Sequence, residues 1–531
     1  IKPLYFAVVD DGRLLVFASE LKGLFAHPSV PRRYDWHAAL QPNLGSSMRP
    51  RELPSFFESI EKLPAGHILD VDLDTGRRSL VRYWQLPGPG EGEVLKSVNH
   101  YVERYRELLA DSVRLRLMAD VRYGLFLSGG IDSAAIAAFA AAYTSFPTFS
   151  VLSRATLMSG DAEASRRVAD HLGLPNHQVL FDAPDITFTP DHWRRVLWAC
   201  ELQLSNPEQF YKYWLHAFAR ERYPDLKVIL LGQGSDEFNG GYISRFVEAE
   251  GEWQPGDWGR LGRSLRLQDN WLRAFPAGFA LKWGDLIQSG VLDLSGLAGF
   301  ACSENEPAIL ARYRGFYRPN LDYHLWHEDR TASAHAVENR VPFLDHRLLE
   351  ILASTPESLH AELFTDKQIL RRSVRGLLPE MFANRKKGYF FMGPGEHHSY
   401  RMMLDILARN DGNLVEQAIE GSRATGGVLH PEGIRAVVRE VREDPRHQGV
   451  PRLIELINMG LIADMAHTAG AGATCRSPVP VYEVGPEDRA RWVAAAQTGS
   501  QGAAAELSDE TVLALGDGVS LVEVRMGSVG G

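Results

Sequence analysis

The stretch VRYGLFLSGGIDSAAIAAFA, residues 121–140, decides the fold. Its first part is an apolar run typical of a buried strand, and its last part is an alanine-rich run typical of a helix. Between them stands the turn SGGIDS, which holds more glycine, serine and aspartate than a change of direction needs. The stretch therefore predicts a strand that leads into a helix through a turn with a chemical role.

The same alternation of strand and helix continues around this stretch. Such alternation is typical of a parallel sheet covered by helices, so the predicted fold class is α/β. The expected helices are residues 97–120, 134–143 and 163–173, the expected strands are residues 121–128, 148–153, 177–182 and 227–232, and residues 260–470 are expected to be mostly helical.

Residues 1–86 show a different sequence pattern, which predicts short strands and turns. Turns at Asp11-Gly12 and Thr75-Gly76 predict two hairpins. The chain begins inside a strand-like run without a methionine, so we expect a segment upstream of it. The glycine- and proline-rich residues 87–93 predict a linker. Residues 471–531 drift into small and polar types and are expected to be partly disordered.

Composition limits the class of protein. The 531 residues carry 57 Lys+Arg against 67 Asp+Glu, a net charge of −10 that argues against nonspecific nucleic-acid binding. Cys200, Cys302 and Cys475 are far apart and lack metal-ligand spacing, which favours a reducing compartment. With no recognisable leader and no apolar run of bilayer length, we expect a cytoplasmic protein without membrane or nucleic-acid partners.

Ser128, Gly129, Gly130, Asp132 and Ser133 stand where the predicted strand meets the predicted helix. That edge of a parallel sheet binds ligands, and a helix start offers unpaired N–H groups to an anion. Glycines let the backbone approach closely and hydroxyls add donors, so the turn predicts a phosphate cradle. Asp132 repels a phosphate unless a cation stands between them, which predicts Mg²⁺. The structural alternative is an ordinary N-capped helix after a glycine turn.

A second polar turn, LLGQGSDEFNGGY at residues 230–242, follows another predicted strand. Asp236 and Glu237 lie between its glycines. Because the carboxyl ends of parallel strands share one edge, we expect Asp236 to complete the magnesium site with Asp132. The alternative is a solvated acidic turn.

These motifs carry a resemblance to a known family. SGGIDS resembles the pyrophosphate loop of the ATP pyrophosphatases, and residues 230–242 resemble the Gly-Glu-Gly-Ser-Asp-Glu motif of asparagine synthetase. EDRTASAHAVENRVPFLDHRLLEIL (328–352) and DKQILRRSVRGLLPEMFANRKKGYF (366–390) are similar to two further blocks of that family. IKPLYF, FASELKGLFAHP, FFESIEKLPAGH and RYW, within residues 1–84, resemble the later half of its glutaminase domain.

The resemblance implies a domain plan. Residues 1–86 are expected to be the later part of an Ntn-type (αββα) glutaminase domain, whose opening catalytic cysteine has no counterpart here. Residues 95–470 are expected to be an ATP-pyrophosphatase (adenine nucleotide α-hydrolase-like) synthetase domain with a largely helical C-terminal half. Residues 471–531 remain as a C-terminal extension.

The resemblance also implies ATP and Mg²⁺ as cofactors. Leu127 and Val151 correspond to positions at the adenine and ribose, and Gly232 to one beneath the nucleotide. Lys386 best matches the family's catalytic lysine, and Lys387 is the alternative because NRKKGY is compressed relative to the family pattern. In this family a substrate carboxylate attacks the α-phosphorus of ATP, and an amine then displaces AMP from the acyl-adenylate.

Position 233 departs from the family, because asparagine synthetases carry Glu there and Gln233 stands here. That Glu lies beside the acyl-adenylate and can accept a proton from ammonia, whereas Gln cannot. β-Lactam synthetases carry Tyr at this position. Ala332 likewise replaces the usual serine. Glu338 and Arg340 are expected to form an ion pair that shapes the pocket.

Three functions follow from these motifs. The leading hypothesis is an asparagine synthetase-type, glutamine-dependent amidotransferase that acts on a small-molecule or peptide carboxylate. The second is an enzyme that closes an amide within its own substrate, as β-lactam synthetases and lasso-peptide cyclases do. The third is a non-catalytic paralogue, against which the retained Asp132 and Asp236 argue. The oligomeric state is open, with a homodimer as one candidate.

Overall fold

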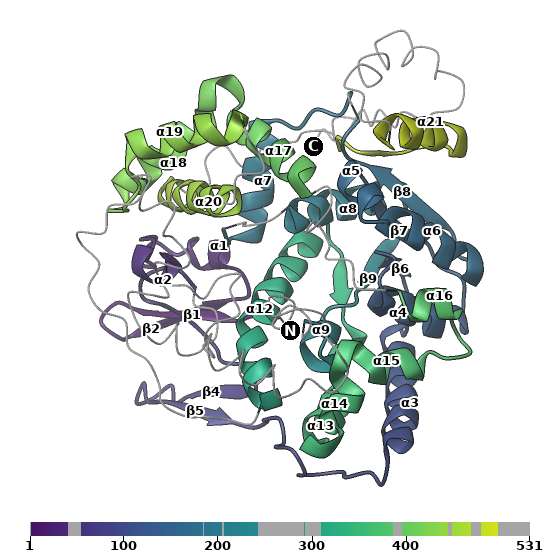
Figure 1. Cartoon of the computed structure of the whole chain (residues 1–531). Helices are drawn as coiled ribbons and strands as arrows, with labels where there is room; N and C mark the ends of the chain where they lie inside the picture. The colour runs from purple at the N-terminus through teal and green to yellow at the C-terminus, as the bar shows by residue number, and fades with distance from the viewer. Residues whose placement is uncertain are drawn as a thin grey trace.

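The computed structural model describes most of the chain. The described residues are 2–40, 55–183, 185–203, 207–242, 291, 309–385, 396–443, 449–468 and 479–497. Within them a long central helix, α12 (Ile309–Ser333), stands between the N-terminal strands and a parallel sheet (Figure 1). The predicted α/β fold class is confirmed.

The central sheet has six strands in the order β10-β9-β6-β7-β8-β11. Five of them run parallel, and β11 pairs with β8 in the antiparallel sense. The strands are β6 (Arg122–Phe126), β7 (Thr148–Leu152), β8 (Asn176–Leu180), β9 (Leu226–Leu230), β10 (Glu338–Arg340) and β11 (Tyr482–Glu483). β6 and β9 are neighbours, so the two polar turns that follow them lie at one edge of the sheet.

Helices cover both faces of the sheet, because alternate strand residues point to opposite sides. Leu125 and Leu127 belong to one core and Phe126 to the other. The first core includes residues of α3 (Val98–Arg116), α4 (Ile131–Ala141), α6 (Asp161–Leu172), α13 (His346–Ser354), α14 (Glu357–Phe364), α15 (Gln368–Ser373) and α16 (Glu380–Ala383). The second includes residues of α7 (Pro190–Cys200), α8 (Glu208–Arg222), α12, α17 (Glu396–Leu407), α18 (Arg409–Ala424), α19 (Pro431–Glu443) and α20 (Val450–His467).

Short helices fill the turns between these elements. They are α5 (Arg154–Met158), α9 (Ser235–Asn239), η3 (Pro342–Leu344) and η4 (Thr365–Lys367). Ser153 starts α5 with a capping box to Thr156, so the polar segment after Val151 is an ordered helix start.

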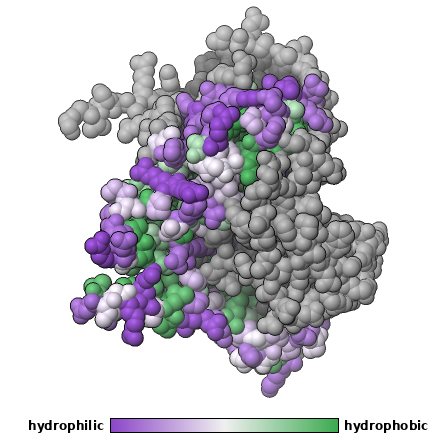
Figure 2. Space-filling view, turned by 90° about the vertical axis from the view of Figure 1, so that its left-hand side faces the viewer, coloured by the Kyte–Doolittle hydropathy of each residue, from purple (hydrophilic) through white to green (hydrophobic). Residues whose placement is uncertain are grey.

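The N-terminal part contains the two predicted hairpins. β1 (Tyr5–Val9), β2 (Leu14–Ala18) and β3 (Ile60–Lys62) form one antiparallel sheet, and β4 (His67–Val71) with β5 (Arg78–Arg82) forms another. The short helices α1 (Leu21–Leu24) and α2 (Trp36–Leu40) follow β2. The β4–β5 hairpin leaves Ile68, Leu80 and Val81 about half exposed. Figure 2 looks at the side of the molecule that carries this hairpin and shows hydrophobic side chains in its lower part.

A buried ion pair ties the N-terminal part to the sheet domain. Glu201, at the end of α7, accepts hydrogen bonds from the backbone N–H groups of Leu21 and Lys22 at the start of α1. The Arg330 guanidinium of α12 donates to the same carboxylate at 3.1 Å. Trp326 of α12 also packs on Tyr5 of β1, with ring centroids 5.2 Å apart. The two parts therefore share one core along α12.

The described C-terminal residues extend the sheet beyond the boundary expected at residue 470. β11 adds to β8, and the following α21 (Pro486–Gln497) buries Trp492 against Leu152 and Leu180. Residues 498–531 lie outside the described residues, as do Cys302 and Cys475, whereas Cys200 is a buried free thiol. Among the helices that the structure describes, none is long and apolar enough to cross a membrane.

Candidate active site at the ends of β6 and β9

The SGGIDS turn leaves β6 and enters α4 as predicted. The Ser133 hydroxyl accepts from the Ser128 backbone N–H at 3.2 Å and lies 3.1 Å from the Ser128 hydroxyl, which closes the turn on itself. Gly130 is the N-cap of α4 and supplies no side-chain cap. The first N–H groups of α4 are therefore available to an anion, as a phosphate cradle requires.

Gly129 is required by the packing behind the turn. Its φ of +77° lies in the left-handed region, and an added Cβ meets Ser165 N at 2.7 Å and Asp161 O at 2.8 Å. Arg385 locks this contact, because its guanidinium donates to the Gly129 carbonyl and to Asp161 Oδ1 at 2.6 Å. The start of α6 thus supports the turn from behind.

Asp132 and Asp236 meet, as the sequence predicted, but a lysine stands between them. Lys367 Nζ lies 2.6 Å from Asp132 Oδ2 and 2.6 Å from Asp236 Oδ1. The Ser235 hydroxyl donates to Asp132 Oδ1 at 2.6 Å. Burial works against the charge of Lys367, but the two carboxylates outweigh it and raise the pKa of the ammonium.

Sequence reasoning missed Lys367, although it stands in the quoted block DKQILRRSV. Asp366 and Lys367 both have positive φ, 45° and 58°, between α14 and α15. Left-handed backbone at two successive non-glycine residues is strained and is typical of functional sites. This sharp turn aims the Lys367 side chain back at the ends of β6 and β9. A lysine directly before a helix-like run was the available signal.

The two carboxylates suit a magnesium ion. Oxygens of Asp132 and Asp236 lie close enough to share one cation, and both side chains are about one-fifth exposed. Mg²⁺ takes carboxylate oxygens together with phosphate oxygens and water. These residues therefore fit the predicted metal, with Lys367 as an additional positive charge beside it. The assignment of Asp132 and Asp236 as ligands stays a prediction.

Glycines allow the two turns to touch. An added Cβ at Gly232 meets the Asp132 Cβ of the first turn at 3.0 Å, whereas one at Gly241 clashes with Asp236 of its own turn. The Leu127 carbonyl accepts from the Ser150 hydroxyl at 2.6 Å, and Val151 is buried in the next strand. Their assignment to the adenine and ribose stays a prediction.

A second charged cluster surrounds Gln233, and sequence reasoning missed it. Gln233 Nε2 donates to Glu328 Oε1 at 2.9 Å and lies 3.4 Å from Glu208 Oε1. Lys212 Nζ bridges the same two carboxylates, at 2.5 Å from Glu208. Asn339 Nδ2 donates to the Glu328 carbonyl at 2.8 Å. Burial raises the pKa of Glu328, whereas at Glu208 the neighbouring Lys212 ammonium outweighs burial and the pKa is lowered.

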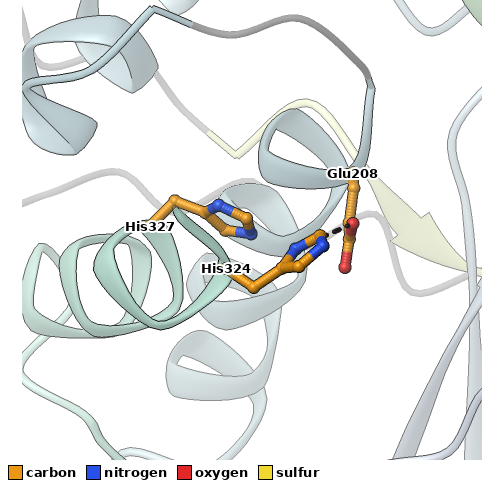
Figure 3. Close-up of side chains that lie close together, drawn as sticks. All are labelled: Glu208, His324 and His327. Atoms are coloured by element: carbon orange, nitrogen blue, oxygen red, sulfur yellow. Dashed lines mark ion pairs between the residues drawn. The ribbon is translucent and has the colours of Figure 1, made fainter. Parts of the chain in front are cut away.

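Two histidines of α12 face Glu208, the first residue of α8 (Figure 3). His324 Nδ1 lies 3.6 Å from Glu208 Oε2, and His327 is fully buried beside it. Candidate ligand atoms of the three side chains all lie within 4.8 Å of one another. Burial lowers the pKa of His327, so its imidazole is neutral at pH 7.

The remaining predicted residues fall in two groups. Glu338 and Arg340 form the expected ion pair at 3.0 Å, on β10. Lys386 and Lys387 lie outside the described residues, so their predicted catalytic role is not placed. Arg385, directly before them, contacts the SGGIDS turn at Gly129.

Comparison with known proteins agrees with this geometry. The family model "Asparagine synthase" matches residues 104–462, more than half of the chain. The chain belongs to the asparagine synthase family. A second model, "Glutamine amidotransferase domain", matches residues 1–84. The resemblance seen in the motifs is therefore confirmed for both parts of this asparagine synthase-family chain.

Curated relatives of this family member span a range of similarity. The chain is 39% identical to asparagine synthetase [glutamine-hydrolyzing] 2 of Bacillus subtilis, over 88% of this chain and 62% of that protein. It is 26% identical to asparagine synthetase [glutamine-hydrolyzing] 3 of the same organism, over 75% and 64%. It is 25% identical to the amidase chry2 of Gibberella zeae, over 74% and 66%. The chain thus spans less than two thirds of these relatives.

Proposed function

We propose that this protein forms amide bonds at the expense of ATP. Mg-ATP adenylates a substrate carboxylate with release of pyrophosphate, and an amine displaces AMP from the acyl-adenylate. The convergence of the SGGIDS turn with Asp132, Lys367 and Asp236 carries the proposal. It sets anion donors and cation-holding carboxylates at neighbouring strand ends, which is what attack on an α-phosphorus needs.

Each part of this site has a role in the proposal. The Ser128 and Ser133 hydroxyls and the first N–H groups of α4 bind phosphate oxygens. Asp132 and Asp236 would hold Mg²⁺, which would neutralise negative charge on the leaving pyrophosphate. Lys367 adds a fixed positive charge, and Lys386 is proposed as the catalytic lysine at the α-phosphate.

The acceptor end of the site is organised around Gln233. Its Nε2 donates to Glu328, which leaves the other edge of the amide, Oε1, to accept a hydrogen bond from an incoming amine. Gln233 thereby orients the amine but takes no proton from it. We assign it a positioning role and propose that the attacking amine loses its proton to another group.

Two kinds of amine fit this arrangement. The glutamine amidotransferase match over residues 1–84 supports glutamine-derived ammonia, which makes a glutamine-dependent amidotransferase of the asparagine synthetase type the leading proposal. Gln233, in place of the glutamate of asparagine synthetases, favours an acceptor acid other than aspartate. An enzyme that closes an amide within its own substrate is therefore the second candidate. A cytoplasmic location and a homodimer stay predictions.

Pyrophosphate release tests the proposal. The full-length protein is incubated with ATP, Mg²⁺ and either glutamine or ammonium, together with aspartate, other amino diacids or peptides. Release with an acid plus glutamine supports the amidotransferase, and release with one peptide or amino diacid alone supports ring closure. Absence of release with every acid supports the non-catalytic paralogue and contradicts the proposal.

A matched pair of variants separates chemistry from folding. Asp132→Asn removes a proposed metal ligand, and we expect pyrophosphate release to fall by at least about 100-fold because charge stabilisation at the phosphates is lost. Asp225→Asn is the control, because Asp225 pairs with Arg122 at the other end of β6 and β9. Equal activity of the two variants contradicts the metal assignment.

A further inference from the structure

The cluster around Glu208 has features that amide formation does not use. It places a carboxylate from α8 against two imidazoles of α12. We propose that Glu208, His324 and His327 bind a transition-metal ion such as Zn²⁺, at a site distinct from the one formed by Asp132 and Asp236.

The geometry suits a three-ligand metal site. His324 and His327 are three residues apart on one helix, so they project from the same face. Their candidate ligand atoms and that of Glu208 lie within 4.8 Å of one another. Ligands about 2.0–2.1 Å from a tetrahedral ion lie about 3.3–3.4 Å apart, so small side-chain rotations complete the site. Two histidines and one glutamate form a known zinc ligand set.

Neighbouring side chains hold these ligands in place. Lys212 binds Glu208 through Oε1, whereas His324 faces Oε2, so one carboxylate oxygen serves the lysine and the other serves the metal. Gln209, the next residue of α8, places its side-chain amide against His327 Nδ1. With the amide turned so that Oε1 accepts from Nδ1–H, this contact orients the imidazole and leaves its Nε2 to the metal.

The charges of the cluster also favour a cation. Among the residues that the structure describes there, Glu208 and Glu328 contribute two negative charges, and Lys212 contributes one positive charge. His327 is fully buried, and His324 and Glu208 are only 13% and 15% exposed. The negative charge that these described residues leave over is costly when buried, and a divalent ion offsets it. The competing arrangement is a protonated His324 paired with Glu208, without a metal.

The position of the site suggests what it does. Gln233 Nε2 lies 3.4 Å from Glu208 Oε1, so the ion stands next to the acceptor end. Three protein ligands leave a fourth position open for water or for a donor atom of the substrate. The site is therefore suited to hold a nitrogen or oxygen donor of the acceptor molecule.

Metal binding by the full-length protein tests the proposal without an activity assay. The protein is treated with a chelator to remove metal, loaded with Zn²⁺ and desalted, and its metal content is then measured. In a parallel experiment Co²⁺ is titrated into the metal-free protein and its visible absorption is recorded. We expect one equivalent of Zn²⁺ and a Co²⁺ spectrum of tetrahedral type. No retained Zn²⁺ and no Co²⁺ band overturn the proposal in favour of the ion pair.

Variants locate the ion. We expect His324→Gln and Glu208→Gln each to weaken Zn²⁺ binding by at least about 100-fold, because a lost ligand costs more than a lost supporting contact. His324→Gln is the safer variant for folding, since it is less buried than His327. His335→Phe is the control, because His335 packs on Tyr213 outside the cluster. Asp132→Asn keeps Zn²⁺ but loses pyrophosphate release, which separates this proposal from the proposed function. Unchanged Zn²⁺ binding in both cluster variants overturns the assignment.

Discussion

Lys367 and Lys212 each hold two carboxylates together, on opposite faces of the sheet near the end of β9. Lys367 reaches Asp132 and Asp236 from the turn before α15, and Lys212 reaches Glu208 and Glu328 from within α8. The charge patterns are alike, with one ammonium between two acids. The supports differ, because Asp132 and Asp236 stand at the starts of α4 and α9 and Lys367 at the end of η4, whereas the second set stands on two long packed helices, α8 and α12.

That difference suits the two ends of the proposed reaction. Asp132 and Asp236 are about one-fifth exposed, so a metal and its phosphates can reach them beside Lys367. Glu328 is only 2% exposed and is fixed by Lys212 and Gln233. A rigid, buried cluster at the proposed acceptor end can select one substrate. A substrate whose polar groups do not match the cluster leaves its buried charges without partners.

The largest expected effect comes from removing each lysine charge. Lys212→Met removes the ammonium that bridges the buried Glu208 and Glu328 carboxylates, so we expect a loss of about 3–5 kcal/mol in the free energy of unfolding. Lys367→Met is the counterpart, and we expect less than half of that loss because water reaches Asp132 and Asp236. Urea titration of the two variants measures the difference.

The activity of the same variants sharpens the comparison. We expect Lys367→Met to abolish pyrophosphate release while the protein stays folded, because its charge serves the phosphates. Equal loss of stability in the two variants contradicts the expected difference between the partly exposed site of Lys367 and the buried site of Lys212.

A pH dependence follows from the buried histidines behind the acceptor end. Burial lowers the pKa of His216 to about 4 and that of His335 to about 3. The unfolded chain takes up these protons below about pH 6.5 and the folded chain does not, so stability is complete above that pH and falls as the pH decreases. We expect about 1.4 kcal/mol per pH unit for each histidine between about pH 6.5 and pH 4.

Thermal unfolding at pH 7.5, 6 and 5 measures this slope. His335→Phe keeps the ring that packs on Tyr213 at 4.4 Å and removes one titrating group, so it is expected to reduce the slope. An unchanged slope in that variant means that His335 takes up its proton in the folded protein as readily as in the unfolded chain, and it contradicts the expectation.

The parts of this site that directly follow a strand in the sequence were predictable, and the others were not. SGGIDS and GQGSDE each follow an apolar strand directly, so the meeting of Asp132 and Asp236 followed from the rules of parallel sheets. Lys367 stands 235 residues from Asp132, in a basic stretch that resembles an ordinary helix start. Its role depends on two left-handed residues that no pattern announces.

The charged cluster around Gln233 and the edge strand β11 could not be predicted from the sequence, for related reasons. Lys212 and Glu328 belong to helices whose charged residues look like solvated faces until α8 and α12 are packed together. The strand β11 has two residues, too few to show any alternation, and only its pairing with β8 reveals it. The two N-terminal hairpins, by contrast, were predictable from their turns.

The smallest expected effect concerns Ser235, which orients the nucleotide-side carboxylate. Its hydroxyl donates to Asp132 Oδ1 at 2.6 Å and accepts from Asn239 Nδ2 at 3.1 Å. Ser235→Ala leaves Lys367 in place, so we expect a loss of about 1–2 kcal/mol in stability and at most about a tenfold decrease in pyrophosphate release. Ser399→Ala, which removes a buried hydroxyl contact with Tyr211 on α8, is the control for stability alone. A decrease as large as that of Asp132→Asn means that Ser235, rather than Lys367, holds the Asp132 carboxylate in its working position, and the nucleotide end is then as rigid as the acceptor end.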